Sequence, residues 1–501
     1  MKRFAGMMGA LLLMPTLAMA SGDMVSISEL RQQVEAMGRW TQTYEAHGRT
    51  IEVDVPIRVP SAEKVPILEC VPWKISEKMT DEIKKETKAE EYDGIINFES
   101  LNNKDTDAHY FGILSKERFE VYHNSPSMLL SRKSQDFLKT EKAEIPIDEI
   151  NEINQIVLKE AGTKALQYTT TEGYAPLREW IANRMNGRLG TAFDKDNILI
   201  THGSQQGLDL SGKVFLDEGD VVLCESPTYL AAISAFKAYG CSFIEIPTDE
   251  EGMMMDVLED VLSNTLHIKL IYAIPTFQNP TGKTWSLERR RKLAELSAKY
   301  SVAVIEDNPY GELRFEGEPL PSIKSFDEAG NILCTGSFSK IFCPGFRIGW
   351  IAGDKDIIRK YVLVKQGTDL QCNTIAQMTI AEYLKRYDID KHIAKIVEVY
   401  RKRRNVAIES IERYFPDTIK FTRPEGGLFT WIELPVGISA REVLVRSLEK
   451  KIAFVPGGSF YPDGNKENTL RINYSNMPED KIEKGLKTLG EVVKEYIRQS
   501  E

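Results

Sequence analysis

A lysine, two serines and an arginine lie close together within residues 335–350, in the sequence TGSFSKIFCPGFRIGW. The amine of Lys340 can form a Schiff base with an aldehyde when it is deprotonated and held in place. The hydroxyls of Ser337 and Ser339 and the guanidinium of Arg347 suit a phosphate, which an arginine binds through two parallel hydrogen bonds. An aldehyde and a phosphate on one small molecule describe pyridoxal phosphate. For this stretch alone, a solvated loop lysine is the alternative interpretation.

Two further polar segments follow predicted strands. Ser204 and Gln205 come after residues 198–200 and open a helix, whose N-terminal N–H groups and serine hydroxyl would bind an anion. Asn279 lies in PTFQNPTG, after the strand predicted at 270–274, and its amide would donate a hydrogen bond to an oxygen on the ring. A helix cap at Ser204 and an ordinary Asn-Pro turn at Asn279 are the alternatives.

Three more side chains have the chemistry to act on such a ligand. Asp307, in EDNPY, would keep a pyridine nitrogen protonated, because a nearby negative charge favours the protonated form. A protonated ring is the better electron sink. Tyr229 in ESPTY would stack on the ring, and Arg471 in TLRINYS would bind a carboxylate. The alternative for Asp307 alone is a helix or turn cap. For Tyr229 it is a core position, and for Arg471 it is a surface ion pair.

Around these residues, short β-branched segments alternate with helical segments, which is typical of a mostly parallel, doubly wound α/β sheet. In such a sheet, ligands bind beyond the carboxyl ends of the strands. The predicted strands are 198–200, 221–224, 242–246, 270–274, 302–306 and 332–335. The predicted helices are 147–162, 176–188, 205–214, 229–239, 255–263 and 287–300.

The C-terminal part differs in pattern. A long helical segment is predicted over 374–414, followed by strands at 429–434 and 469–474 and helices at 440–450 and 478–497. This mixture indicates a smaller α/β domain. We therefore expect an N-terminal arm over 126–164, a large cofactor-binding domain over 165–373, and an interdomain helix with a small domain over 374–501.

Composition excludes several functional classes. The formal net charge is −10, and no clustered basic face is evident, so a nucleic-acid partner is not expected. None of the six cysteines forms a CxxC pair, which argues against a zinc site or a disulfide framework. We therefore expect no bound metal.

The N-terminus has the features of a secretory signal peptide. Lys2 and Arg3 precede an apolar run that ends in Ala18-Met19-Ala20, which is a basic start followed by a small-residue cleavage site. The run is short for a membrane span, and no other segment is predicted to cross a membrane. Residues 1–20 therefore predict export to the periplasm or the cell exterior. A buried first helix is the alternative.

Residues 21–125 form a separate region, to which the sequence assigns no function. Apolar residues at helical spacing predict a helix over 27–45. Alternating polarity with three prolines predicts extended structure over 50–68. The charged stretch 81–91 is a helix candidate.

From about Gly162 to its end, the chain resembles the fold-type I, class I/II pyridoxal-phosphate aminotransferases. Within them it is similar to the 2-aminoadipate and multi-substrate branch, which shares its domain with winged-helix regulators. The motifs that carry the resemblance are ALQYTTTEGYAPLR, HGSQQGLDL, ESPTY, PTFQNPTG, EDNPYGELRF, GSFSK with PGFRIGW, RPEGGLFTW, and VPGGSFY with LRINYS.

The resemblance implies a role for each matching position. Lys340 would hold the cofactor as a Schiff base and move a proton at the substrate, Asp307 would pair with the ring nitrogen, and Tyr229 would stack on the ring. Arg471, with Asn279 beside it, would bind the substrate α-carboxylate. Tyr168 would reach the phosphate of the neighbouring subunit in a homodimer. The remaining contacts implied are Asn279 and the catalytic Tyr310 at the ring oxygen, and Ser204, Gln205, Ser337, Ser339 and Arg347 at the phosphate.

The sequence also departs from the family pattern. The glycine-containing strand that precedes the first helix is replaced by residues 132–144, RKSQDFLKTEKAE, and the regulators' winged-helix domain is absent. Most members of the family work in the cytoplasm, which is the alternative to export. The expected activity is ping-pong transfer of an amino group between an L-amino acid and a 2-oxo acid. A fold-type I β-lyase and a non-catalytic protein that binds amino acid or cofactor are the other hypotheses.

Overall fold

The computed structural model describes residues 145–500, together with the backbone of the strands β1–β7 in the N-terminal part. Contacts divide the chain into two compact units, 1–136 and 137–501, which are described separately. The predicted signal peptide, the helix candidate at 81–91 and the segment 132–144 lie outside the described residues. The boundaries expected at residues 126, 165 and 374 stay predictions.

The N-terminal unit contains short antiparallel strands. β1 (Trp40–Ala46) pairs along its whole length with β2 (Arg49–Val55), so the helix predicted over 27–45 is wrong where it overlaps β1. Aromatic and β-branched residues are frequent in β1 and favour a strand that has a partner. The extended structure expected over 50–68 is present in β2 and β3. The other strands are β3 (Ile57–Arg58) with β4 (Glu69–Cys70), and β5 (Gly94–Glu99), β6 (His109–Leu114) and β7 (Phe119–His123).

The second unit is built on an eight-stranded sheet in the order β11-β10-β9-β12-β13-β14-β15-β8. Five neighbouring strands, β10-β9-β12-β13-β14, run parallel to one another. This confirms the predicted mostly parallel α/β sheet. β15 is antiparallel to both of its neighbours and was not predicted. The strands are β8 (Ile198–Thr201), β9 (Val221–Ser226), β10 (Ser242–Asp249), β11 (Gly252–Met253), β12 (Ile268–Ala273), β13 (Ala303–Asp307), β14 (Ile332–Ser337) and β15 (Gly349–Ala352).

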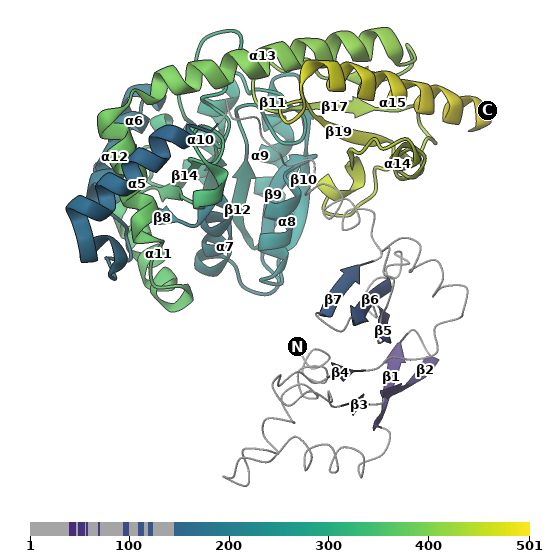
Figure 1. The fold of residues 1–501 in the computed structure, drawn as a ribbon, viewed down its shortest axis with the longest axis horizontal. Helices are drawn as coiled ribbons and strands as arrows, with labels where there is room; N and C mark the ends of the chain where they lie inside the picture. The colour runs from purple at the N-terminus through teal and green to yellow at the C-terminus, as the bar shows by residue number, and fades with distance from the viewer. Residues whose placement is uncertain are drawn as a thin grey trace. The chain divides into compact units, whose positions relative to one another are not determined.

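Helices cover both faces of this sheet (Figure 1). One core packs α9 and α10 against one face, through residues such as Leu258 and Leu293. The other core packs α7, α8 and α11 against the opposite face, through residues such as Leu208, Phe236 and Tyr361. Burial on both faces explains why most residues of the central strands are apolar. These helices are α7 (Gly203–Phe215), α8 (Leu230–Lys237), α9 (Met255–Asn264), α10 (Leu287–Tyr300) and α11 (Lys355–Thr368), of which α11 was not predicted.

Two helices precede the sheet, as predicted. α5 (Ile147–Ala161) ends at Gly162, where φ is 54°, a backbone conformation that glycine adopts more readily than other residues. The short helix η2 (Gly162–Leu166) follows it, and α6 (Ala175–Leu189) begins with a proline in its first turn, where proline is well tolerated.

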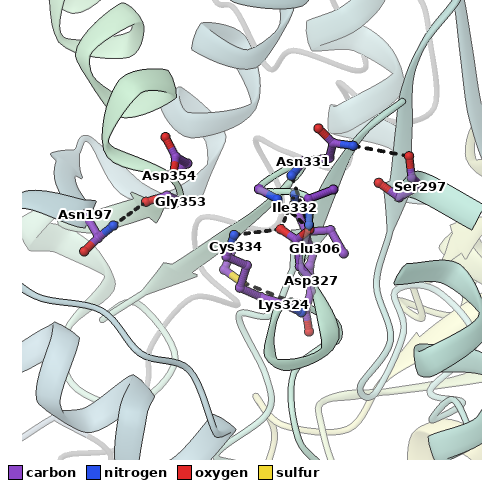
Figure 2. Close-up of polar contacts among 12 residues, drawn as sticks. Asn197, Ser297, Glu306, Lys324, Asp327, Asn331, Ile332, Cys334, Gly353 and Asp354 are labelled. Carbon is purple, nitrogen blue, oxygen red and sulfur yellow. Dashed lines mark hydrogen bonds and ion pairs between the residues drawn. The ribbon is translucent and has the colours of Figure 1, made fainter. Parts of the chain in front are cut away.

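Side chains of β13 alternate between the two faces of the sheet, so Glu306 and Asp307 have different surroundings. Figure 2 shows Glu306 with Cys334 of β14 and Lys324 of the short helix η4 (Ile323–Phe326). The Glu306 carboxylate accepts hydrogen bonds from the backbone N–H groups of Ile323 and Lys324, both at 3.1 Å. Glu306 therefore fastens the segment before β14 to the sheet and leaves Asp307 directed to the opposite face.

The helical segment predicted over 374–414 is two helices, α12 (Thr374–Arg386) and α13 (Ile389–Tyr414). The break occurs because Tyr387 and Asp388 are extended and the Asp388 carboxylate accepts hydrogen bonds from the N–H groups of Asp390 and Lys391, which starts a new helix.

The small C-terminal domain contains a four-stranded antiparallel sheet in the order β16-β17-β19-β18. The long helix α13 runs beside α15 (Figure 1). No helix in residues 145–500 is both long and apolar enough to cross a membrane. The remaining elements are β16 (Lys420–Phe421), β17 (Phe429–Glu433), β18 (Val455–Pro456), β19 (Thr469–Asn473), α14 (Ala440–Glu449) and α15 (Glu479–Ser500).

Candidate active site

The predicted chemical residues gather where the parallel strands end. Asp307 and Ser337 are the last residues of β13 and β14. Tyr229 and Asn279 lie in the loops that follow β9 and β12, and Ser204 follows β8 in the first turn of α7. Because β8 runs in the same direction as β14, all of these loops meet at one edge of the sheet. This edge is where open α/β sheets bind ligands.

Asp307 is buried at this edge and accepts two hydrogen bonds. The Tyr272 hydroxyl donates to its Oδ2 at 2.7 Å, and the Thr335 hydroxyl donates to its Oδ1 at 2.5 Å. Burial raises the pKa of the Asp307 carboxyl, and the two hydroxyl donors act in the opposite direction. Tyr272 and Thr335 were not among the predicted site residues. The register of β13 with β14 places Thr335 opposite Asp307, which the sequence alone does not reveal.

Lys340 lies in the turn after β14 and is partly buried. Burial lowers the pKa of its amine most, and the positive charges of Arg471 and Arg347 lower it further. Burial and the nearby positive charges both disfavour the protonated, cationic form of the amine. In the described part of the chain, no hydrogen bond engages this amine. A lysine with a lowered pKa and a free amine is suited to Schiff-base chemistry.

Ser337, Ser339 and Arg347 form a polar turn next to the start of α7. The Ser337 hydroxyl donates to Ser339 Oγ at 2.8 Å, and Arg347 Nη1 donates to the same oxygen at 3.4 Å. Arg347 Nη2 donates to the backbone oxygen of His202 at 3.4 Å. Within residues 145–500, no carboxylate pairs with Arg347. The turn therefore combines an available guanidinium, two hydroxyls and a helix N-terminus, which together suit a phosphate.

Two glycines permit this close packing. A Cβ atom on Gly203 would lie 2.5 Å from Arg347 Nη2, and one on Gly349 would lie 2.7 Å from the backbone nitrogen of Ser204. Gly203 also has a φ of 73°, which other residues adopt at a cost. The predicted ligand Gln205 differs from its neighbours, because its Nε2 donates to the backbone oxygen of Ala231 at 2.9 Å. Its side-chain amide is thus directed toward α8.

Asn279, Tyr310 and Arg471 form a hydrogen-bonded chain. Asn279 Nδ2 donates to Tyr310 Oη at 3.3 Å, and Arg471 Nη1 donates to Asn279 Oδ1 at 2.8 Å. The guanidinium carbon of Arg471 also lies 4.1 Å from the ring centroid of Phe429 and 5.0 Å from that of Phe460. Burial lowers the pKa of Arg471 to about 10, so it remains a cation at neutral pH. No acidic side chain in the described residues pairs with it, which leaves its charge available for a carboxylate ligand.

The loop that carries Asn279 is held by two buried ionisable residues, Glu225 and Arg290, that the sequence did not reveal. Glu225 accepts hydrogen bonds from Ile274 N and Trp285 Nε1, both at 2.8 Å, and burial raises its pKa to about 8. Arg290 Nη2 donates to the backbone oxygen of Pro275 at 2.7 Å. These contacts fix both ends of the loop, so Asn279 is positioned by long-range hydrogen bonds.

Two tyrosines complete the predicted set. Tyr229 is partly buried just before α8, and burial, with the nearby Asp307 charge, raises the pKa of its hydroxyl. Tyr168 is 77% exposed, and its hydroxyl makes no contact with the other predicted site residues in the described part of the chain. Its loop is anchored by a hydrogen bond from Thr169 N to Gln371 Oε1, and by one from Thr374 Oγ1 to Gln167 O at 3.1 Å.

Comparisons with known proteins agree with this site. Residues 134–489 match the family model for aminotransferase class I and II, so the chain belongs to this family. It is 45% identical to aromatic-amino-acid aminotransferase 1 of Thermococcus litoralis over 357 residues, which cover 70% of this chain and 86% of that protein. It is 41% identical to the 2-aminoadipate transaminase of Thermus thermophilus over 352 residues, covering 70% of this chain and 87% of that protein.

A solved structure supports the same assignment. The kynurenine aminotransferase of Pyrococcus horikoshii, determined with PMP, is 44% identical and superposes with a TM-score of 0.69 over 71% of this chain and 89% of that one. The site fits the cofactor of the class I/II family, because it combines an amine of lowered pKa, a buried carboxylate and an anion-binding turn. The protein is therefore a pyridoxal-phosphate-dependent aminotransferase.

The available charge of Arg471 generates a prediction. Replacing Arg471 with alanine removes the cation that donates a hydrogen bond to Asn279 and that would bind the substrate carboxylate. The values of kcat/KM for the amino acid and for the oxo acid should both fall, each by an amount equivalent to about 2–4 kcal/mol of lost transition-state stabilisation. Steady-state kinetics measures this loss. Arg423→Ala, which removes an exposed arginine from the same domain, is the control and should have no effect. An equal loss with amines that lack a carboxylate would show that Arg471 does not bind that group.

Proposed function

We propose that this enzyme transfers an amino group between an L-amino acid and a 2-oxo acid by a ping-pong mechanism, with aromatic L-amino acids as its preferred donors. It would belong to the 2-aminoadipate and multi-substrate branch of the family. The observation that carries the reaction type is the placement of Lys340, Asp307 and Arg471 around one edge of the sheet. The substrate preference rests on similarity to proteins named for aromatic amino acids and kynurenine.

Bound pyridoxal phosphate supplies an aldehyde and a ring that withdraws electrons from the substrate. Lys340 has a lowered pKa, so its neutral amine is suited to accept a proton from the substrate Cα and return it elsewhere. The Asp307 carboxylate would keep the ring nitrogen protonated. Asn279 and Tyr310, joined by a hydrogen bond, would bind the ring oxygen.

The cationic residues would orient both ligands. Arg347, with the hydroxyls of Ser337 and Ser339, would hold the phosphate. Arg471 would bind the substrate α-carboxylate, because the aromatic rings of Phe429 and Phe460 hold its guanidinium without neutralising it. Holding the substrate at two points fixes its Cα relative to the Lys340 amine, which is the geometric requirement for proton transfer.

A substrate screen tests the proposed reaction. Purified holoenzyme is given each L-amino acid with 2-oxoglutarate, and the new amino acid and oxo acid are quantified. Phenylalanine, tyrosine and tryptophan should exceed alanine in kcat/KM by about tenfold or more, because a pocket for a large side chain gains binding energy from it. D-enantiomers are the control and should not react. Release of ammonia without a new amino acid would indicate a lyase, and complete inactivity would indicate a binding protein.

We also propose that the working unit is a homodimer and that residues 21–125 are not part of it. The exposed Tyr168 lies in an anchored loop, and in the proposed dimer it would bind the phosphate held by the neighbouring subunit. The described residues of the site all come from the second unit.

Sedimentation and cofactor titration test the dimer. The full chain and a shortened chain that begins at Pro126 should both sediment as dimers and bind pyridoxal phosphate with similar affinity. Tyr168→Phe should weaken cofactor binding about tenfold, because a hydrogen bond to a charged group is lost. Tyr387→Phe, which loses a hydroxyl bonded to Glu152, is the control. A shortened chain that is monomeric and loses the cofactor would place the N-terminal region in the working unit.

A further inference from the structure

The Tyr272 hydroxyl is aimed at the carboxylate that faces the ring-binding edge of the sheet. Tyr272 is 1% exposed and donates to Asp307 Oδ2 at 2.7 Å, while Thr335 donates to the other oxygen. Each carboxylate oxygen thus accepts one hydroxyl hydrogen bond. Unlike Asp307, Tyr272 belongs to none of the segments for which the sequence predicted a chemical role.

Strand geometry makes this contact rigid. Tyr272 is paired with Ile305 in the register of β12 with β13, and Ile305 precedes Asp307 by two residues, so both side chains lie on the same face of the sheet. The Tyr272 ring packs edge-on against Phe236, with centroids 5.8 Å apart. Burial, and then the charge of Asp307, raise the pKa of Tyr272 well above its usual value. Its hydroxyl is therefore a permanent donor.

Asp307 depends on such donors because no cation compensates its charge. Within the described residues, no lysine or arginine forms an ion pair with it. Its charge instead raises the pKa of two neighbouring hydroxyls, those of Tyr229 and Tyr310, from the loops after β9 and β13. Burial without a donor would favour the neutral carboxylic acid, which cannot stabilise a positive charge.

We propose that Tyr272 is a positioning residue for the reaction, because its hydroxyl fixes the Asp307 carboxylate as the acceptor that keeps the cofactor nitrogen protonated. This inference rests on the proposed role of Asp307. When the Tyr272 hydrogen bond is lost, the carboxylate becomes more basic and the shared proton moves from the ring nitrogen toward Asp307. The ring then withdraws electrons less effectively, although substrate contacts through Arg471 remain.

Nuclear magnetic resonance of the holoenzyme reconstituted with pyridoxal phosphate that carries nitrogen-15 in its ring measures this proton directly. In Tyr272→Phe, the nitrogen signal should move toward its unprotonated position, by about a tenfold change in the proton equilibrium, which is the effect of one hydrogen bond. The kcat should fall about tenfold, with KM changed less than about twofold. Thr335→Val removes the donor to the other oxygen and should shift the signal in the same direction.

Tyr361→Phe is the matched control, because Tyr361 is equally buried in the same core and donates to Ser211 Oγ at 2.8 Å. It should leave both the nitrogen signal and kcat unchanged. An unchanged signal in Tyr272→Phe would overturn the inference, whatever Thr335→Val does. The variant Asp307→Asn distinguishes the inference about Tyr272 from the proposed role of Asp307. A ring nitrogen that stays protonated in this variant would refute the role of Asp307 itself.

Discussion

A carboxylate buried at the end of a central parallel strand is the constraint on which this site depends. Transfer of an isolated charge into a protein interior is unfavourable, and Asp307 has no cationic partner in the described residues. The sheet provides hydroxyl donors on both neighbouring strands, Tyr272 and Thr335. On the opposite face, Glu306 fastens the segment that leads into β14, so the strand that carries Thr335 is fixed against β13.

The cationic residues of the site, unlike Asp307, repel one another. Lys340, Arg347 and Arg471 lie around the same edge, and none of them is paired with an acidic side chain in residues 145–500. Their mutual repulsion contributes to the lowered pKa of Lys340. Aromatic rings hold Arg471, and backbone oxygens hold Arg347. The phosphate of the cofactor and the carboxylate of the substrate would each offset part of this positive charge. The cationic residues are therefore arranged to bind two anionic groups.

The sequence predicted the residues that lie in loops after strands, because such residues occur in short motifs whose type and order are visible. Asn279, Asp307, Lys340 and Arg347 all follow strand patterns that the β-branched segments reveal. The strand β15 and the helix α11 were not predicted. The four residues of β15 form a strand only because they pair with β14 and β8. Tyr272, Thr335, Glu225 and Arg290 act through contacts between segments distant in the chain. The alternation of residues along a buried strand does not mark Tyr272, Thr335 or Glu225 as polar contacts of the site, and Arg290 is one of several charged residues in the helix α10.

The central claim is that Lys340 is the residue that binds the cofactor aldehyde. Borohydride reduction of the holoenzyme, followed by peptide mapping by mass spectrometry, tests it directly, because reduction makes the lysine–cofactor bond permanent. The expected result is a single pyridoxyl modification on Lys340, and in Lys340→Ala neither that modification nor the visible absorbance of the bound cofactor should appear. Stoichiometric modification of a different lysine would contradict the assignment.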